Sequence, residues 1–78
     1  MSDSKIKHDS IDIGKNIRQA RKNASMGQTE MAVQLQLMGV DMTREALVKI
    51  ERGKQHIYAS QLKAIHDLLG ISYDDLLK

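Results

Sequence analysis

The chain has 78 residues, enough for one small domain, and carries a formal net charge of +2 at pH 7. Its composition, 41 % hydrophobic and 28 % charged, is typical of a globular protein rather than a disordered one. Because it contains no cysteine, a disulfide and a thiolate metal site are both excluded, and the fold must depend on core packing. A chain this short, with only 3 % aromatic residues, is poorly suited to enclosing a substrate-sized pocket, so a binding module is favoured over an enzyme.

Signals of membrane insertion or export are not visible in the sequence. No apolar run approaches the roughly 20 residues that a membrane-spanning helix requires. Residues 1–10 are too polar for the apolar part of a secretory signal, and the missing cysteines fit a reducing compartment. We therefore expect a cytoplasmic protein with no membrane segment.

The positive charge is concentrated in one part of the chain. Basic residues outnumber acidic ones by six to five over residues 1–42 and by four to two over 43–56, whereas acidic residues lead by three to two over 57–78. Such a local excess is expected of a surface that contacts a polyanion. On charge alone, a solvated helix face would look the same.

The first predicted elements are a polar arm and a helix. Residues 1–9 are polar and predict a flexible N-terminal arm. Residues 11–24 predict a helix with Ser10 as its N-cap. The helical spacing is carried by four apolar residues, Ile13, Ile17, Ala20 and Ala24.

A second and a third helix follow. The second is predicted from Gln28 until Gly39, a residue suited to the left-handed position after a helix. Its expected buried stripe comprises Met31, Ala32, Leu35 and Met38. The third helix is predicted to begin after its N-cap, Thr43, and to end at Gly53. Met42 and Leu47 have the spacing of a hydrophobic staple at its start.

Two further helices complete the chain. The fourth carries its apolar positions at Leu62, Ile65, His66 and Leu69. Ser60 is its candidate N-cap, and Gly70 ends it. Ser72 caps a short fifth helix, with a staple formed by Ile71 and Leu76. No strand pattern appears, so the sequence predicts a compact all-α domain of five helices over residues 10–78, and the second and third suggest a helix-turn-helix.

Several short motifs stand in a specific order: Ile13-Gly14-Lys15-Asn16-Ile17-Arg18, Arg21-Lys22, Gln28-Thr29-Glu30-Met31-Ala32, Lys49-Ile50-Glu51-Arg52-Gly53-Lys54, Leu68-Leu69-Gly70-Ile71-Ser72 and Asp75-Leu76-Leu77. Together they resemble the Cro/lambda-repressor-type helix-turn-helix family, also called the xenobiotic-response-element family, over about residues 11–78. The stretch 28–53 is longer than the commonest family spacing. In this respect the chain is similar to a subset of the family that has a longer turn between the second and third helices.

The resemblance implies DNA binding through the second and third helices. The implied DNA-contacting residues are Gln28, Thr43, Arg44, Glu45, Lys49, Arg52 and Lys54. The first would contact a phosphate, the next four would project from the third helix (about 43–52) into the major groove, and the last two would hold the DNA backbone. Arg21 and Glu51 match a family pair that forms a structural salt bridge.

The chemistry of these residues fits base and phosphate recognition. The two-donor fork of Arg44 can contact guanine O6 and N7, and Glu45 can accept from cytosine N4. Gln28 lies where a helix N-terminus already favours a phosphate. The alternatives are solvated side chains and, for Glu45 with Lys49, an ordinary i,i+4 helix pair.

No catalytic, metal or cofactor site is indicated. The three histidines, His8, His56 and His66, lack the cysteines or the close carboxylate spacing of a zinc site. His66 is instead expected to pack at the edge of the core. Asp74 and Asp75 are adjacent at a helix start, where capping explains them.

The sequence therefore favours a sequence-specific double-stranded DNA-binding transcriptional regulator, in this family most often a repressor. One recognition helix reads only a few base pairs, so two copies on a roughly two-fold operator are expected. A weak homodimer would use the fifth helix, residues 57–58 or the N-terminal arm. The alternative is an antitoxin that also binds a toxin, or a protein-interaction adaptor.

Overall fold

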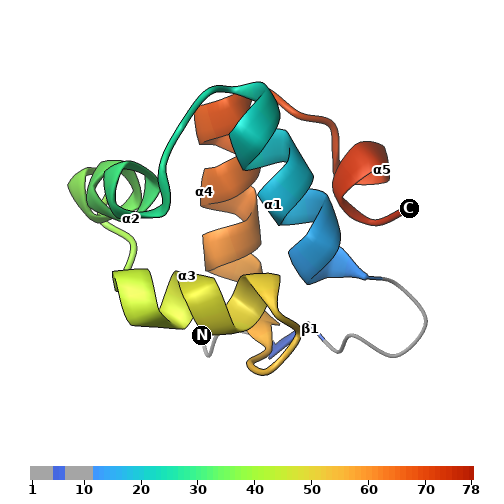
Figure 1. The fold of residues 1–78 in the computed structure, drawn as a ribbon, viewed down its shortest axis with the longest axis horizontal. Coiled ribbons are helices and arrows are strands. Elements are labelled where there is room, and N and C mark those ends of the chain that lie inside the picture. Colours follow the sequence, from blue (N-terminus) through green and yellow to red (C-terminus); the bar gives the residue numbers. More distant parts are fainter. Residues whose placement is uncertain (1–4, 7–11) are drawn as a thin grey trace.

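The computed structural model describes residues 5–6 and 12–78 of the chain. In chain order the elements are β1 (Lys5–Ile6), α1 (Ile13–Asn23), α2 (Gln28–Leu37), α3 (Arg44–Glu51), β2 (Ile57–Tyr58), α4 (Ala59–Leu69) and α5 (Tyr73–Leu76). In Figure 1, α1 and α4 lie side by side at the centre, with α2 and α5 on opposite sides of them and α3 across one end. The described part of the chain thus has the all-α, five-helix architecture that the sequence predicts.

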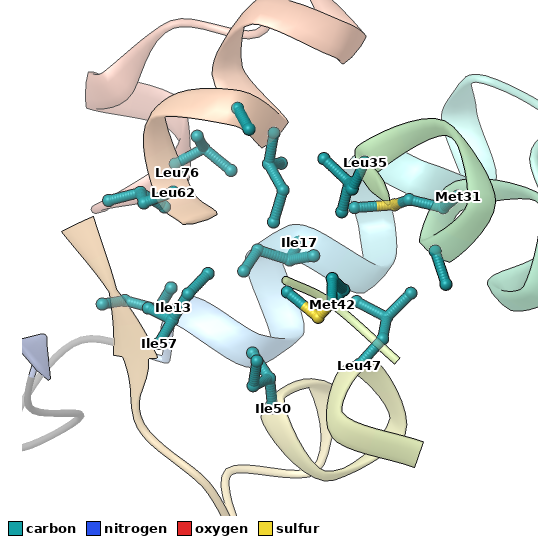
Figure 2. Close-up of a cluster of buried hydrophobic side chains, with 13 residues drawn as sticks. Ile13, Ile17, Met31, Leu35, Met42, Leu47, Ile50, Ile57, Leu62 and Leu76 are labelled. Carbon is teal, nitrogen blue, oxygen red and sulfur yellow. The ribbon is translucent and has the colours of Figure 1, made fainter. Parts of the chain in front are cut away.

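The core lies where the helices meet, and every helix contributes to it. Its large side chains with less than 2 % exposure are Ile13, Ile17, Met31, Leu35, Met42, Leu47, Ile50, Ile57, Ile65 and Leu76. Figure 2 shows Ile17 of α1 near the middle of this cluster, with side chains from the other elements around it. Burial of these aliphatic side chains is the main stabilising contribution in a domain without disulfides.

Met38 departs from the buried stripe predicted for α2. The other three members of the stripe are buried as expected, but Met38 is 43 % exposed. α2 ends at Leu37, and the amide of Val40 donates to the carbonyl of Leu35 (3.0 Å), which folds the chain back. The helical period therefore stops before Met38, and Met42 from the following turn enters the core.

Side-chain caps and left-handed glycines define several helix ends. The hydroxyls of Thr43 and Ser72 accept the amides of Ala46 (3.0 Å) and Asp75 (3.1 Å), so both predicted N-caps are confirmed. Positive φ angles are found at all three glycines predicted to end helices, Gly39, Gly53 and Gly70.

The first helix begins later than the sequence predicts. The N-cap of α1 is Asp12, whose carboxylate accepts the amide of Lys15 (3.0 Å). The predicted cap, Ser10, lies outside the described residues. The predicted helix of residues 11–24 would have placed Asp12 in its first turn, but an aspartate is as good an N-cap as a serine, and the two positions differ by only two residues.

The cap of α4 also differs from the prediction. α4 begins at Ala59, and Oε1 of Gln61 accepts the amide of Tyr58 (2.9 Å). Ser60 therefore lies inside the helix and is not its N-cap. Gln61 occupies the third helical position, from which a side-chain amide reaches back to the start of the helix.

A two-residue strand pair was not predicted. β1 and β2 pair in antiparallel register, with Lys5 opposite Tyr58 and Ile6 opposite Ile57. Two residues are too few for an alternating pattern, so the sequence carries no periodic signal for these strands. The remainder of the predicted flexible arm, residues 1–4 and 7–9, lies outside the described residues.

Gly14 brings α1 against the C-terminal end of α3. A Cβ added at Gly14 would collide with the backbone carbonyl oxygen of Ile50 and press on that of Glu51. Only a glycine therefore allows the two helices this close approach. The contact fixes where α3 lies on the domain.

Candidate nucleic-acid interface

α3 turns one face to the core and another face to solvent. Leu47 and Ile50 are fully buried, whereas the residues predicted to project into the major groove are exposed, namely Thr43, Arg44, Glu45 and Lys49. The apolar face thus determines which side chains point outward. Among the described residues, neither Glu45 nor Lys49 forms an ion pair, so the i,i+4 pair considered above is not formed in the structure.

A buried ion pair anchors α3 to α1. Nε of Arg21 donates to Oε2 of Glu51 (2.8 Å), and Nη2 donates to Oε1 (3.0 Å). The Arg21 and Glu51 side chains are only 9 % and 2 % exposed. The hydrogen bond to Glu51 raises the pKa of Arg21 above its ordinary value despite the opposing effect of burial, so the guanidinium stays charged. Its Nη1 also donates to the carbonyl of Met26 (2.9 Å), which ties the loop before α2 to the same pair.

Gln28, predicted to contact a phosphate, contacts Glu51 in the structure. Its Nε2 donates to Oε1 of Glu51 (3.1 Å), and the residue is half-buried. The N-cap of α2 is Gly27, which offers no side-chain acceptor. The first amides of α2 therefore have no side-chain cap, and Gln28 retains a second N–H and its carbonyl oxygen for another partner.

An open groove of about 660 Å³ lies between α1, the start of α2 and the end of α3. It is lined by Arg18, Arg21, Gln28, Val48, Glu51, Arg52 and Lys54. Glu51 is neutralised by Arg21. Among the described residues, the other three cations of the lining form no ion pair. The groove is therefore positively charged and chemically suited to an anion such as a phosphate.

Arg18 is the functional candidate that the sequence analysis missed. The sequence indicated no role for it beyond its place in one of the family motifs, yet it lines the groove together with Arg52 and Lys54. Arg18 precedes Arg21 by three positions, which places the two on the same side of a helix. That spacing, combined with the expected Arg21–Glu51 contact, was the signal that could have found it.

His66 packs at the edge of the core, as predicted. Its Nδ1 lies 2.6 Å from the carbonyl oxygen of Ile71, and its ring stacks on Tyr73 with ring centres 4.1 Å apart. A carbonyl oxygen only accepts hydrogen bonds, so Nδ1 carries the proton. His8 lies outside the described residues, and in the part of the chain that the structure describes no group of three or more acidic, histidine or cysteine side chains could hold a metal ion.

The comparison with protein families agrees with this geometry. A family model described as a helix-turn-helix domain matches residues 14–78, which cover all five helices except the first residue of α1. The chain belongs to this family. It is a Cro/C1-type helix-turn-helix domain, a kind of DNA-binding domain found in transcriptional regulators and typical of non-enzymes. Neither the search of the curated proteins nor the search of the solved structures gave a match.

The helix-turn-helix consists of α2 and α3, joined by residues 38–43. The groove borders both helices, because it is lined by Gln28 at the start of α2 and by Val48 of α3. An exposed face of α3 and a cationic groove thus adjoin each other on this domain. No helix in the described ranges, residues 12–78, is long and apolar enough to cross a membrane.

Two surfaces expected to join copies of the domain differ in accessibility. Ile57 is 0 % exposed and part of the core, so its side chain is not available for the dimer contact considered from the sequence. Tyr58 is half-buried, and the backbone of both residues pairs with β1. On α5, Leu76 is buried but Tyr73 is 40 % exposed.

Proposed function

We propose that this helix-turn-helix domain is a sequence-specific reader of double-stranded DNA and regulates transcription as a repressor. The observation that carries the proposal is the pairing of an exposed polar face on α3 with an adjoining groove that holds three cations without ion-pair partners among the described residues. Phosphate contacts supply affinity and orientation, whereas base contacts supply specificity. The groove offers the phosphate contacts, and the exposed face of α3 offers the base contacts.

In this proposal the groove holds the DNA backbone. Arg52 and Lys54 neutralise phosphates, and Arg18 joins them from α1. The start of α2 adds the dipole of its uncapped N-terminus and the free N–H of Gln28. Because Arg21 already neutralises Glu51, the carboxylate at the groove does not repel the phosphate.

The exposed face of α3 reads the bases in the major groove. Arg44 and Glu45 lie in its first turn, from which a recognition helix reaches base edges. Arg44 pairs with a guanine, and Glu45 accepts from a cytosine amino group. Lys49 contacts a base or phosphate one turn further along. Thr43 uses its hydroxyl oxygen as the helix cap, which leaves the hydroxyl proton to donate to DNA.

Two copies of the domain would bind together. Recognition helices of such dimers lie one DNA turn apart, about 34 Å. The exposed Tyr73 on α5 is the side chain best suited to a weak contact between copies. Binding of the pair over a promoter would exclude polymerase. The function also agrees with the expected cytoplasmic localisation, because a DNA reader acts where the chromosome lies.

The test is selection of a sequence from random duplex DNA at physiological salt. The wild-type chain is expected to enrich a palindromic motif, and the double variant Arg44→Ala/Lys49→Ala is expected to lose it. The matched control is Lys15→Ala/Lys63→Ala, which removes the same charge from exposed positions of α1 and α4. Base reading by α3 would be disproved if the Arg44→Ala/Lys49→Ala variant still enriched the motif, or if the wild type enriched no motif.

A protein partner is the second candidate function, and one observation favours it. The second half of α2 and its cap expose three large apolar side chains, Val33 (45 %), Leu37 (76 %) and Met38 (43 %). An antitoxin or adaptor would use such a surface. A toxin-like reading frame beside the gene, and co-purification of its product with the wild type but not with Leu37→Lys, would support this function.

A further inference from the structure

The turn of the helix-turn-helix is held at two consecutive carbonyl groups. Nε2 of Gln36, on α2, donates to the carbonyl of Met42 (2.7 Å). Nε2 of Gln61, on α4, donates to the carbonyl of Asp41 (2.9 Å). The backbone directly before the N-cap of α3 is therefore attached to the helices on both sides of it. We name the Gln36 and Gln61 side chains the amide clamp.

Gln61 is the more constrained member of the clamp. The residue is 8 % exposed, and its Oε1 also accepts the amide of Tyr58 (2.9 Å). The donor and acceptor ends of one side-chain amide thus hold two backbone segments that are remote in sequence. A glutamate could still accept from Tyr58 but could not donate to Asp41 when ionised.

The opposite end of α3 is held without the clamp. There Glu51 is fixed by Arg21 and Gln28, and Gly14 packs against the carbonyl of Ile50. The cationic groove lies at this C-terminal end. The clamp acts at the N-terminal end of α3, where Arg44 and Glu45 lie.

We infer that Gln61, together with Gln36, is a positioning residue for DNA reading, which fixes the first turn of α3 without touching DNA itself. The inference rests on the proposed function. Because the groove is anchored separately, loss of the clamp lowers affinity for the selected sequence and leaves generic DNA binding intact. A merely structural role would lower both affinities together, in proportion to the folded fraction.

The experiment compares full-length variants with a matched control. Gln61→Glu keeps the cap of α4 and removes the donor to Asp41, while Gln36→Met removes the donor to Met42. Gln34→Glu and Gln34→Met make the same changes at an exposed glutamine of α2. All proteins are measured well below their melting temperatures, which are determined by circular dichroism.

The first measurement is amide hydrogen exchange in the free protein. In both clamp variants, exchange of the hydrogen-bonded amides of Val40, Ala46 and Leu47 is expected to accelerate about tenfold, while the amides near Arg21 and Glu51 keep the wild-type rate. The Gln34 variants should resemble the wild type. Unchanged exchange in the clamp variants would show that the clamp does not hold the turn and would overturn the inference.

The second measurement is the ratio of affinities for the selected duplex and for a generic duplex at one salt concentration. The ratio is expected to fall about tenfold in the clamp variants and to stay constant in the Gln34 variants. A proportional fall in both affinities would overturn the positioning role. If the wild type itself shows no sequence preference, the proposed function fails, and the exchange measurement still decides whether the amide clamp orders the turn.

Discussion

The two ends of α3 are held by different chemistry. At the C-terminal end, Arg21 and Glu51 form a buried ion pair. At the N-terminal end, the neutral amide clamp of Gln36 and Gln61 holds two carbonyl groups. Removing one partner of a buried neutral hydrogen bond costs about 1–3 kcal/mol, whereas removing one partner of a buried ion pair costs about 3–5 kcal/mol. α3 is therefore held more strongly at its C-terminal end, beside the groove, than at its N-terminal end, where base reading is proposed.

The difference also concerns electrostatics. The ion pair neutralises Glu51 inside the groove, which leaves the neighbouring Arg18, Arg52 and Lys54 to determine its charge. The amide clamp adds no charge beside Arg44 and Glu45, the two residues proposed to read bases. A strong charged anchor beside the groove proposed to hold the DNA backbone, and a neutral anchor beside the helix turn proposed to read bases, would suit the two kinds of DNA contact.

The largest effect is expected from breaking the strong anchor. Glu51→Leu leaves the guanidinium of Arg21 buried without a counter-charge. It should lower the free energy of unfolding by about 3 kcal/mol, at the lower end of the range because the groove is open to solvent. The double variant Arg21→Met/Glu51→Leu should recover most of this loss. Urea unfolding followed by circular dichroism measures both, and equal losses in the single and double variants would contradict the explanation.

A smaller effect is expected from separating α1 and α3 at the same end. Gly14→Ala places a methyl group against the backbone of Ile50, so the helices must move apart, at an expected net cost of about 1–3 kcal/mol. The control is Gly27→Ser, where a Cβ meets nothing within 4 Å and the change should be within a few tenths of a kcal/mol. Thermal or urea unfolding of the two variants should differ clearly, and similar stabilities would refute the close-approach argument.

Single changes at the proposed DNA surface are expected to have the smallest effect on stability, and their effect on binding sharpens the comparison of the two ends. Arg18→Ala should weaken selected and generic duplexes alike and reduce the slope of log affinity against log salt by about one. Arg44→Ala should cost about 1–3 kcal/mol on the selected duplex and little on the generic one. Fluorescence anisotropy titrations over a salt series distinguish the two patterns. Identical behaviour of both variants would remove the division between a backbone-binding and a base-reading end.

Much of the fold could be predicted because its signals are local in the sequence. Helical spacing of apolar residues indicated the first, second and fourth helices, and an N-cap with a hydrophobic staple indicated the third and fifth. Thr43 and Ser72 were found as caps because a cap acts within one turn. The order of short motifs indicated the helix-turn-helix family, to which the chain belongs. The outward-facing residues of α3 were those that the family resemblance implied, and Leu47 and Ile50 of the same helix are buried.

Contacts between residues remote in sequence could not be predicted from these local signals. The attachment of Gln61 to Asp41 leaves no periodic signal in the chain, and the three-residue spacing of Arg18 and Arg21 places Arg18 beside the groove only when it is combined with the contact between Arg21 and Glu51. Likewise, Gln28 contacts Glu51 in the free protein, and Ile57, which was considered for a dimer contact, is buried in a two-residue strand. Local periodicity decides which helices form, whereas the partner of a polar side chain depends on which backbone groups the packed helices bring within hydrogen-bonding distance.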